Sequence, residues 1–200
     1  MARTSAALPD ARPIRAAGAM LLGGLGVSLL WRILFAPMLL GDFDPTDMPG
    51  HQRALLALGL LATALIAAGG LVQLARGLRS TDAGPAAAGA SVAAVTGVAL
   101  LATNILTLFA GMDFIGLFWA FGVVTAAAWI VTSVALVRSG LLKWSGMATA
   151  TLSALVIIGL VTGATIIFIM FFATLPLAIG LARWQAVSAA PLSATTQQLS

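Results

Sequence analysis

Residues 147–182, MATATLSALVIIGLVTGATIIFIMFFATLPLAIGLA, form the longest apolar stretch of this sequence. As one helix, these 36 residues would be about 54 Å long, whereas the hydrocarbon core of a bilayer is about 30 Å thick. The excess would place side chains such as Phe168 and Phe172 in water, so the stretch is expected to fold back on itself. The small polar patch at 162–165 is the expected turn, which gives two short helices at 147–162 and 165–183.

The composition of the whole chain indicates a membrane protein. Of its 200 residues, 60 % are hydrophobic and 8 % are charged, whereas soluble domains carry about 25 % charged residues. So few polar side chains cannot cover a domain in water, which excludes a soluble globular protein, a disordered chain and a nucleic-acid-binding module. The absence of cysteine also excludes disulfides, thiolate metal sites and cysteine nucleophiles.

Further apolar segments of membrane-spanning length cover residues 14–40, 54–75, 86–110 and 114–137. Together with the two helices of 147–183 they predict an all-α, polytopic transmembrane helix bundle of six spans, with a single transmembrane domain over residues 14–184. The alternative is five spans followed by a re-entrant or interfacial last segment, broken at Pro176. Residues 185–200 are polar and uncharged, and are expected to form a disordered tail.

The distribution of basic residues predicts the orientation of the six spans. Eight Lys and Arg residues fall on one side of this topology, and Arg53 falls on the other. Because cytoplasmic loops of membrane proteins are rich in Lys and Arg, both termini, including residues 1–13, are expected in the cytoplasm, with the bundle in the plasma membrane. The eight residues are Arg3, Arg12, Arg15, Arg76, Arg79, Arg138, Lys143 and Arg183.

Two stretches carry a resemblance to a known group of proteins. Residues 137–161, VRSGLLKWSGMATATLSALVIIGLV, join an Arg-Ser-Gly turn to a Trp-Ser-Gly helix entry, and residues 11–24, ARPIRAAGAMLLGG, form a basic lead into a helix of small residues. Both are similar to the corresponding parts of uncharacterised six-helix bacterial integral membrane proteins of about this length. The resemblance implies six spans and implies no activity.

Arg32 is the most costly residue inside an expected span. It lies about 12 Å below the outer end of the first span, where an arginine costs about 2.5–3.5 kcal/mol on insertion scales. Asn104 of the third span lies at a similar depth, and we expect an Arg32–Asn104 contact that holds the two helices together. The alternatives are that Arg32 extends to the interface, or that these two residues bind an anionic or polar ligand.

Four residues of the polar stretch after the first span could bind a cation. Asp42, Asp44, Asp47 and His51 offer carboxylate and imidazole ligands of the kind that divalent cations use. Their spacing matches no calcium loop, because the required glycine and the closing glutamate are missing. A solvated acidic loop is therefore the favoured interpretation, and no metal or cofactor is expected.

Aromatic residues gather in the outer half of the expected bundle. They could line a cavity for a quinone, a lipid tail or another apolar ligand. Ordinary packing and an interfacial aromatic belt are the alternative. The residues of this candidate cavity are Phe109, Phe118, Trp119, Phe168 and Phe172.

No catalytic residue is expected, because the spans lack the histidines and carboxylates that serine hydrolases, proton relays and haem sites need. The favoured function is a non-enzymatic accessory subunit or a small apolar-ligand-binding module that acts through helix packing. Its expected partners are membrane lipids, and another membrane protein or a second copy of the chain. A small solute transporter or permease is the alternative, and a membrane enzyme that uses the outer Asp/His cluster comes third.

Overall fold

The computed structural model of this protein describes residues 11–39, 49–79, 83–110, 115–162 and 172–184. All regular structure in these ranges is helical, which confirms the expected all-α fold for this part of the chain. The helices are α1 (Ala11–Leu39), α2 (Gly50–Leu78), α3 (Gly84–Ala110), α4 (Ile115–Arg138), α5 (Trp144–Thr162) and α7 (Leu175–Ala182).

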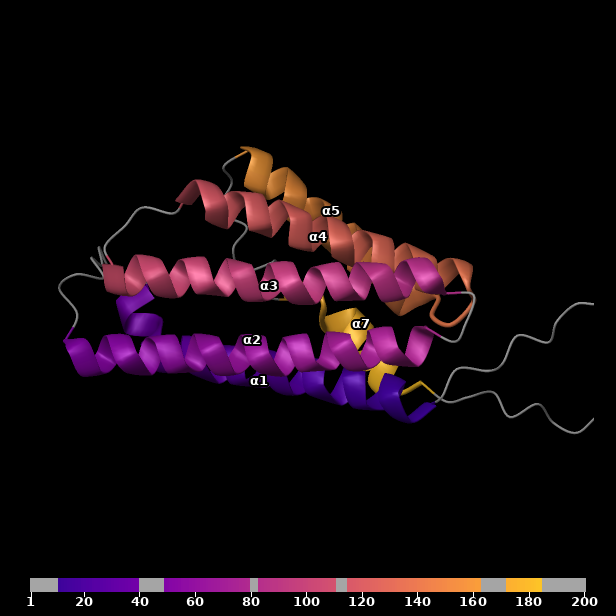
Figure 1. Ribbon diagram of the computed structural model, residues 1–200, viewed down its shortest axis with the longest axis horizontal. Coiled ribbons are helices and arrows are strands. Elements are labelled where there is room, and N and C mark those ends of the chain that lie inside the picture. Colours follow the sequence, from indigo (N-terminus) through magenta and orange to yellow (C-terminus); the bar gives the residue numbers. More distant parts are fainter. Residues whose placement is uncertain (1–10, 40–48, 80–82, 111–114, 163–171, 185–200) are drawn as a thin grey trace, which may run out of the picture.

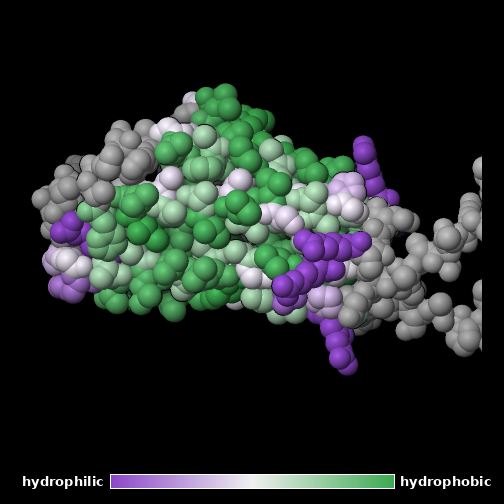
Figure 2. Space-filling model, in the orientation of Figure 1, coloured by the Kyte–Doolittle hydropathy of each residue, from purple (hydrophilic) through white to green (hydrophobic). Residues whose placement is uncertain are grey.

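Five of the described helices, α1 to α5, are long and apolar enough to cross a membrane. Apolar side chains cover the surface of the bundle between its two ends, and hydrophilic residues gather at the ends (Figure 2). Val95 of α3 and Val161 of α5, for example, are 70 % and 75 % exposed. An apolar surface of this extent is stable against lipid tails rather than against water. The protein is therefore a multi-pass helical membrane protein.

The long helices follow one another as antiparallel neighbours, because short connections join them (Figure 1). Each helix from α1 to α5 packs against the next one, and α7 packs against both α1 and α5. The short helix α7 thereby closes a ring of helices that would otherwise be open between α1 and α5. Because α7 contacts the first and the last long helix, it joins parts of the chain that are far apart in the sequence.

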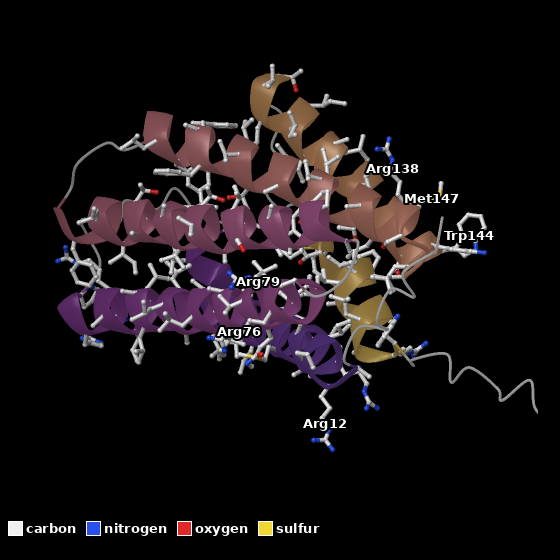
Figure 3. The ribbon with its side chains drawn as sticks, turned by 45° about the vertical axis from the view of Figure 1, so that its right-hand side comes forward. Arg12, Arg76, Arg79, Arg138, Trp144 and Met147 are labelled. Atoms are coloured by element: carbon white, nitrogen blue, oxygen red, sulfur yellow. The ribbon has the colours of Figure 1, made fainter. Side chains whose placement is uncertain are left out.

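One end of the bundle is strongly basic, and we call it the basic end. It is the end at which α1, α3 and α5 begin and at which α2 and α4 end (Figure 1). Its exposed cationic side chains are Arg12, Arg15, Arg76, Arg79, Arg138, Lys143 and Arg183, several of which are labelled in Figure 3. Trp144 is also exposed there, next to Lys143 in the sequence. At the opposite end, His51 is exposed and Arg53 is half-buried in the first turn of α2.

Among the described residues, the largest fully buried apolar side chains gather in the half of the bundle next to the basic end. The largest fully buried apolar side chains come from the beginning of α1, the ends of α2 and α4, and α7. They are Ile14, Leu74, Leu78, Leu136, Leu177 and Leu181. Since two of these six belong to α7, this short helix is part of the core of the bundle.

The expectation of one continuous helix over 165–183 is wrong in its described part. The chain turns at Ala173 and Thr174, and α7 begins only at Leu175. Pro176 lies in the first turn of α7, where its missing N–H needs no partner, so it starts a helix instead of breaking one. The eight residues of α7 span about 12 Å, less than half the hydrocarbon thickness. Residues 163–171 lie outside the described residues.

The ends of other helices extend beyond the expected spans. Helix α2 begins at Gly50, so His51 and Arg53 belong to its first turn and not to a loop. Helix α5 begins at Trp144, before the expected start at residue 147. Polar and aromatic residues are stable at the level of the lipid headgroups, so a helix can continue past the apolar segment that the sequence marks.

A glycine allows α7 to approach α1 closely. A Cβ atom at Gly18 of α1 would collide with backbone atoms of Leu181 and Ala182. Backbone atoms cannot move aside as the end of a side chain can, so a larger residue at this position must displace α7. In contrast, a Cβ atom at Gly26 of the same helix would meet nothing within 4 Å.

We therefore expect Gly18→Ala to lower the thermal unfolding temperature of the purified protein in detergent, because overpacking costs about 1–3 kcal/mol. Gly26→Ala is the matched control. It is expected to leave the unfolding temperature unchanged or to raise it, since alanine is favoured over glycine inside helices by about 1 kcal/mol. Equal unfolding temperatures for the two variants would contradict the close contact between α1 and α7.

Candidate functional site

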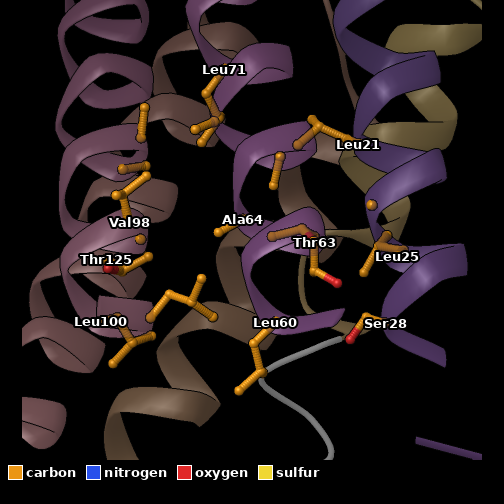
Figure 4. A pocket seen from close by; sticks show the side chains of 18 of the residues that line it. Leu21, Leu25, Ser28, Leu60, Thr63, Ala64, Leu71, Val98, Leu100 and Thr125 are labelled. Carbon is orange, nitrogen blue, oxygen red and sulfur yellow. The ribbon is translucent and has the colours of Figure 1, made fainter. Parts of the chain in front are cut away.

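A cavity of about 220 Å³ lies between α1, α2, α3 and α4 and is partly open at its edge. Figure 4 shows its walls, in which apolar side chains predominate. Leu21 and Leu25 come from α1, Leu60 and Ala64 from α2, and Trp129 from α4. Apolar cavities of about 150 Å³ can hold a molecule of the size of benzene. The cavity in this protein is therefore large enough for a small organic ligand.

Polar side chains reach the cavity from every helix around it. They are Ser28 of α1, Thr63 of α2, Asn104 of α3, Thr125 of α4, and Thr174 directly before α7.

Some of these polar groups already have partners. The Thr63 hydroxyl donates to the backbone oxygen of Gly59 at 2.9 Å, and the Thr125 hydroxyl donates to the hydroxyl oxygen of Thr96 at 2.8 Å. Ser28 is only 6 % exposed, and it lies in the wall of the cavity. Its hydroxyl is therefore placed where a ligand in the cavity could form a hydrogen bond with it.

The beginning of α7 is held next to the cavity by a hydrogen bond from another helix. The backbone N–H of Leu177 donates to the hydroxyl oxygen of Thr149 of α5 at 3.0 Å. The first N–H groups of a helix have no partner within the helix, and an unpaired one is costly in the membrane interior. Thr149 is fully buried, so water does not replace its hydroxyl. This bond fixes the position of Thr174, which lines the cavity.

Thr149→Val is expected to lower the unfolding temperature in detergent, because it leaves the N–H of Leu177 unpaired at a cost of about 1–3 kcal/mol. Thr149→Ser keeps the hydroxyl and is expected to retain more of the wild-type stability, although it loses a buried methyl group. If the valine variant is as stable as the serine variant, the hydroxyl of Thr149 does not support α7.

The predicted contact between Arg32 and Asn104 stays a prediction. Arg32 lies in the helical part of α1, but its side chain is outside the described residues. Asn104 is half-buried at the cavity, and its amide nitrogen donates to the backbone oxygen of Leu100 at 3.0 Å, within α3. A hydrogen bond between helices is instead observed at Thr96 and Thr125, which link α3 to α4. Such bonds contribute about 0.6 kcal/mol in membrane proteins.

The predicted cation site at the outer end is not tested either. Asp42, Asp44 and Asp47 lie outside the described residues, and His51 is exposed in the first turn of α2. Within the described ranges, no three side chains of the kinds that ligate metals lie together.

The predicted aromatic residues occupy different environments. Phe118 lines the cavity and packs edge to face with Trp119, with 6.3 Å between the ring centroids. Phe109 and Phe172 are 52 % and 45 % exposed, and Phe168 lies outside the described residues. Among the described residues, one member of the predicted aromatic set therefore lines the cavity, together with aliphatic side chains of three helices.

Most of the residues that line the cavity cannot be picked out from the sequence pattern. Ser28, Thr63, Thr125, Trp129 and Thr174 were not singled out, although Thr125 and Trp129 are spaced to share one face of a helix. Small hydroxyl residues occur throughout these spans, and their spacing does not distinguish a cavity from a helix contact. The spacing of Thr125 and Trp129 was therefore visible in the sequence, but it did not by itself indicate a cavity.

Comparisons with protein-family models, with curated proteins and with solved structures find no match for this chain. The resemblance to six-helix bacterial membrane proteins therefore stays a prediction. What the structure establishes is the class, a multi-span helical membrane protein.

Proposed function

We propose that the protein is a non-enzymatic, membrane-embedded binding module for a small, uncharged, largely apolar molecule. The observation that carries this proposal is the cavity of about 220 Å³ within the ring of helices. Binding sites for small molecules are concave, mostly apolar and supplied with a few polar groups. The cavity has each of these properties.

The lining residues indicate the chemistry of the ligand. No Asp, Glu, Lys, Arg or His is present among the described residues of the cavity wall. A charged ligand would therefore lack a counter-ion there, which is costly in a medium of low dielectric constant. The hydroxyl of Ser28 can form a hydrogen bond with one hydroxyl or carbonyl group of a neutral ligand. This serine has no histidine beside it in the described wall, so the proposed role is binding and not hydrolysis.

An accessory role in a membrane assembly fits the same proposal. The helices expose apolar faces along their length, which can contact lipids, another membrane protein or a second copy of the chain. In this role, the occupied cavity would stabilise the ring of helices, because a ligand that binds only the folded state raises its stability.

Gly97 of α3 provides a direct test of the binding proposal. It lines the cavity, and a Cβ atom added there would meet nothing within 4 Å. Gly97→Leu is therefore expected to fill part of the cavity without a collision at the first side-chain atom. Val95→Leu is the matched control, because residue 95 is 70 % exposed on the same helix and faces away from the core.

The probe is para-fluorobenzyl alcohol, a ring with one hydroxyl, whose fluorine NMR signal is followed in detergent with each purified variant. We expect saturable binding to the wild type and to Val95→Leu, and a loss of at least about tenfold in affinity for Gly97→Leu, about 1.4 kcal/mol. Equal binding by all three, or binding by none of them, would contradict a cavity that takes ligands of this class.

A second candidate function is transport of such a molecule. It is favoured by one observation, which is that α7 is a short helix that begins inside the bundle, next to the cavity at Thr174. Discontinuous helices that end at a binding site inside the membrane are typical of secondary transporters. In this function, α7 would move relative to α1 and α5 and open the cavity to either side.

Cysteine labelling can separate binding from transport, because the chain contains no cysteine of its own. Lys143→Cys and His51→Cys mark the two ends, since both side chains are exposed at opposite ends of the bundle. With a membrane-impermeant maleimide, we expect Lys143→Cys to react only in inverted plasma-membrane vesicles and His51→Cys only in intact cells, as the basic end is proposed to face the cytoplasm.

Ser28→Cys then reports on the cavity in the same preparations. A binding module predicts reaction from one side at most, whereas a transporter predicts reaction from both sides. Reaction of Ser28→Cys from both sides would replace the binding proposal with the transport proposal.

A further inference from the structure

A second hollow lies on the surface of the bundle, near its basic end. This groove of about 710 Å³ lies between the beginning of α3 and the last turns of α4. Ala83 and Pro85 form one wall, and Ile130, Val134 and Arg138 belong to the other. It shares no lining residue with the interior cavity, so an inference about it does not depend on the proposed function.

The groove is apolar along most of its length and opens toward the lipid. From Ile130 to Arg138 it follows α4 over nine residues, and the eight steps between them cover about 12 Å along the helix. Val131, another of its lining residues, is 50 % exposed. The surface around it is part of the apolar band that faces the hydrocarbon of the membrane. An occupant of this part of the groove must therefore be an apolar chain.

The end of the groove at the membrane surface is positively charged. Arg138 is exposed there, in the last turn of α4. The N-terminus of α3, at Gly84, adds the positive end of a helix dipole. No acidic side chain is present among the described lining residues, and Asp82, which precedes Ala83 in the sequence, lies outside the described residues. A guanidinium group in this position is suited to bind a phosphate.

We propose that this groove binds one phospholipid with an anionic headgroup. An acyl chain lies along Ile130, Val131 and Val134, and the phosphate region contacts Arg138. The charge of Arg138 selects an anionic headgroup over a zwitterionic one, since each basic residue near a membrane surface attracts anionic lipid. A soluble phosphate ester would leave the apolar part of the groove unfilled, which is why the proposal specifies a lipid.

Native mass spectrometry of the full-length chain in mild detergent tests this proposal. The protein is titrated with palmitoyl-oleoyl phosphatidylglycerol and, separately, with phosphatidylcholine of the same acyl chains. We expect one phosphatidylglycerol to bind at a lower concentration than phosphatidylcholine, and Arg138→Gln to weaken that binding about fivefold. Arg76→Gln is the matched control, because Arg76 is exposed in the last turn of α2 at the same end but does not line the groove.

A second variant tests the apolar part of the groove. Val131→Trp places a large side chain on the lipid-facing surface and is expected to block the acyl chain, so tight binding of both lipids is lost while the protein stays folded. Three results would overturn the proposal. They are equal weakening by Arg76→Gln and Arg138→Gln, equal binding of the two lipids to the wild type, and unchanged binding to Val131→Trp. Competition by glycerol phosphate at the concentration of the lipid would likewise show that the acyl chain is not recognised.

Discussion

The structure depends on the way in which a helix can begin inside a membrane. The first backbone N–H groups of α7 have no partner within that helix, and lipid offers none. The hydroxyl of Thr149 accepts the N–H of Leu177, and Pro176 has no N–H to satisfy. These two features let an eight-residue helix lie in the core, where water is absent and an unpaired donor would be costly.

The position of α7 has consequences for the rest of the bundle. Because α7 packs between α1 and α5, it closes the ring of helices and fills the half of the interior next to the basic end with Leu177 and Leu181. Its first turn lies at the interior cavity, which Thr174 helps to line. The same small helix therefore contributes both to the buried core of the described residues and to the wall of the cavity. This arrangement links the proposed binding function to the stability of the bundle.

The interior cavity and the surface groove lie in different environments and therefore suit different ligands. The cavity is lined by neutral groups, such as Ser28 and Thr125, and suits an uncharged ligand. The groove ends at Arg138, at the level of the lipid headgroups, and suits an anionic lipid. A charged side chain is stable at the groove because water and lipid headgroups solvate it. Inside the bundle, a charged group would require a counter-ion.

The sequence alone determined that the chain is surrounded by lipid and that its fold is helical. It also determined the positions of the long apolar helices and of the basic end. Backbone groups in lipid must be satisfied within helices, so apolar length is sufficient to mark α1 to α5. Only the tertiary structure decided which helix faces point inward, where α7 begins and which residues form the cavity. A helix packed between lipid and apolar neighbours has apolar side chains on every face, so its periodicity does not identify the buried one. For the same reason Ser28 and Trp129 could be assigned to the cavity, and Val95 to the lipid, only once the helices were placed beside one another.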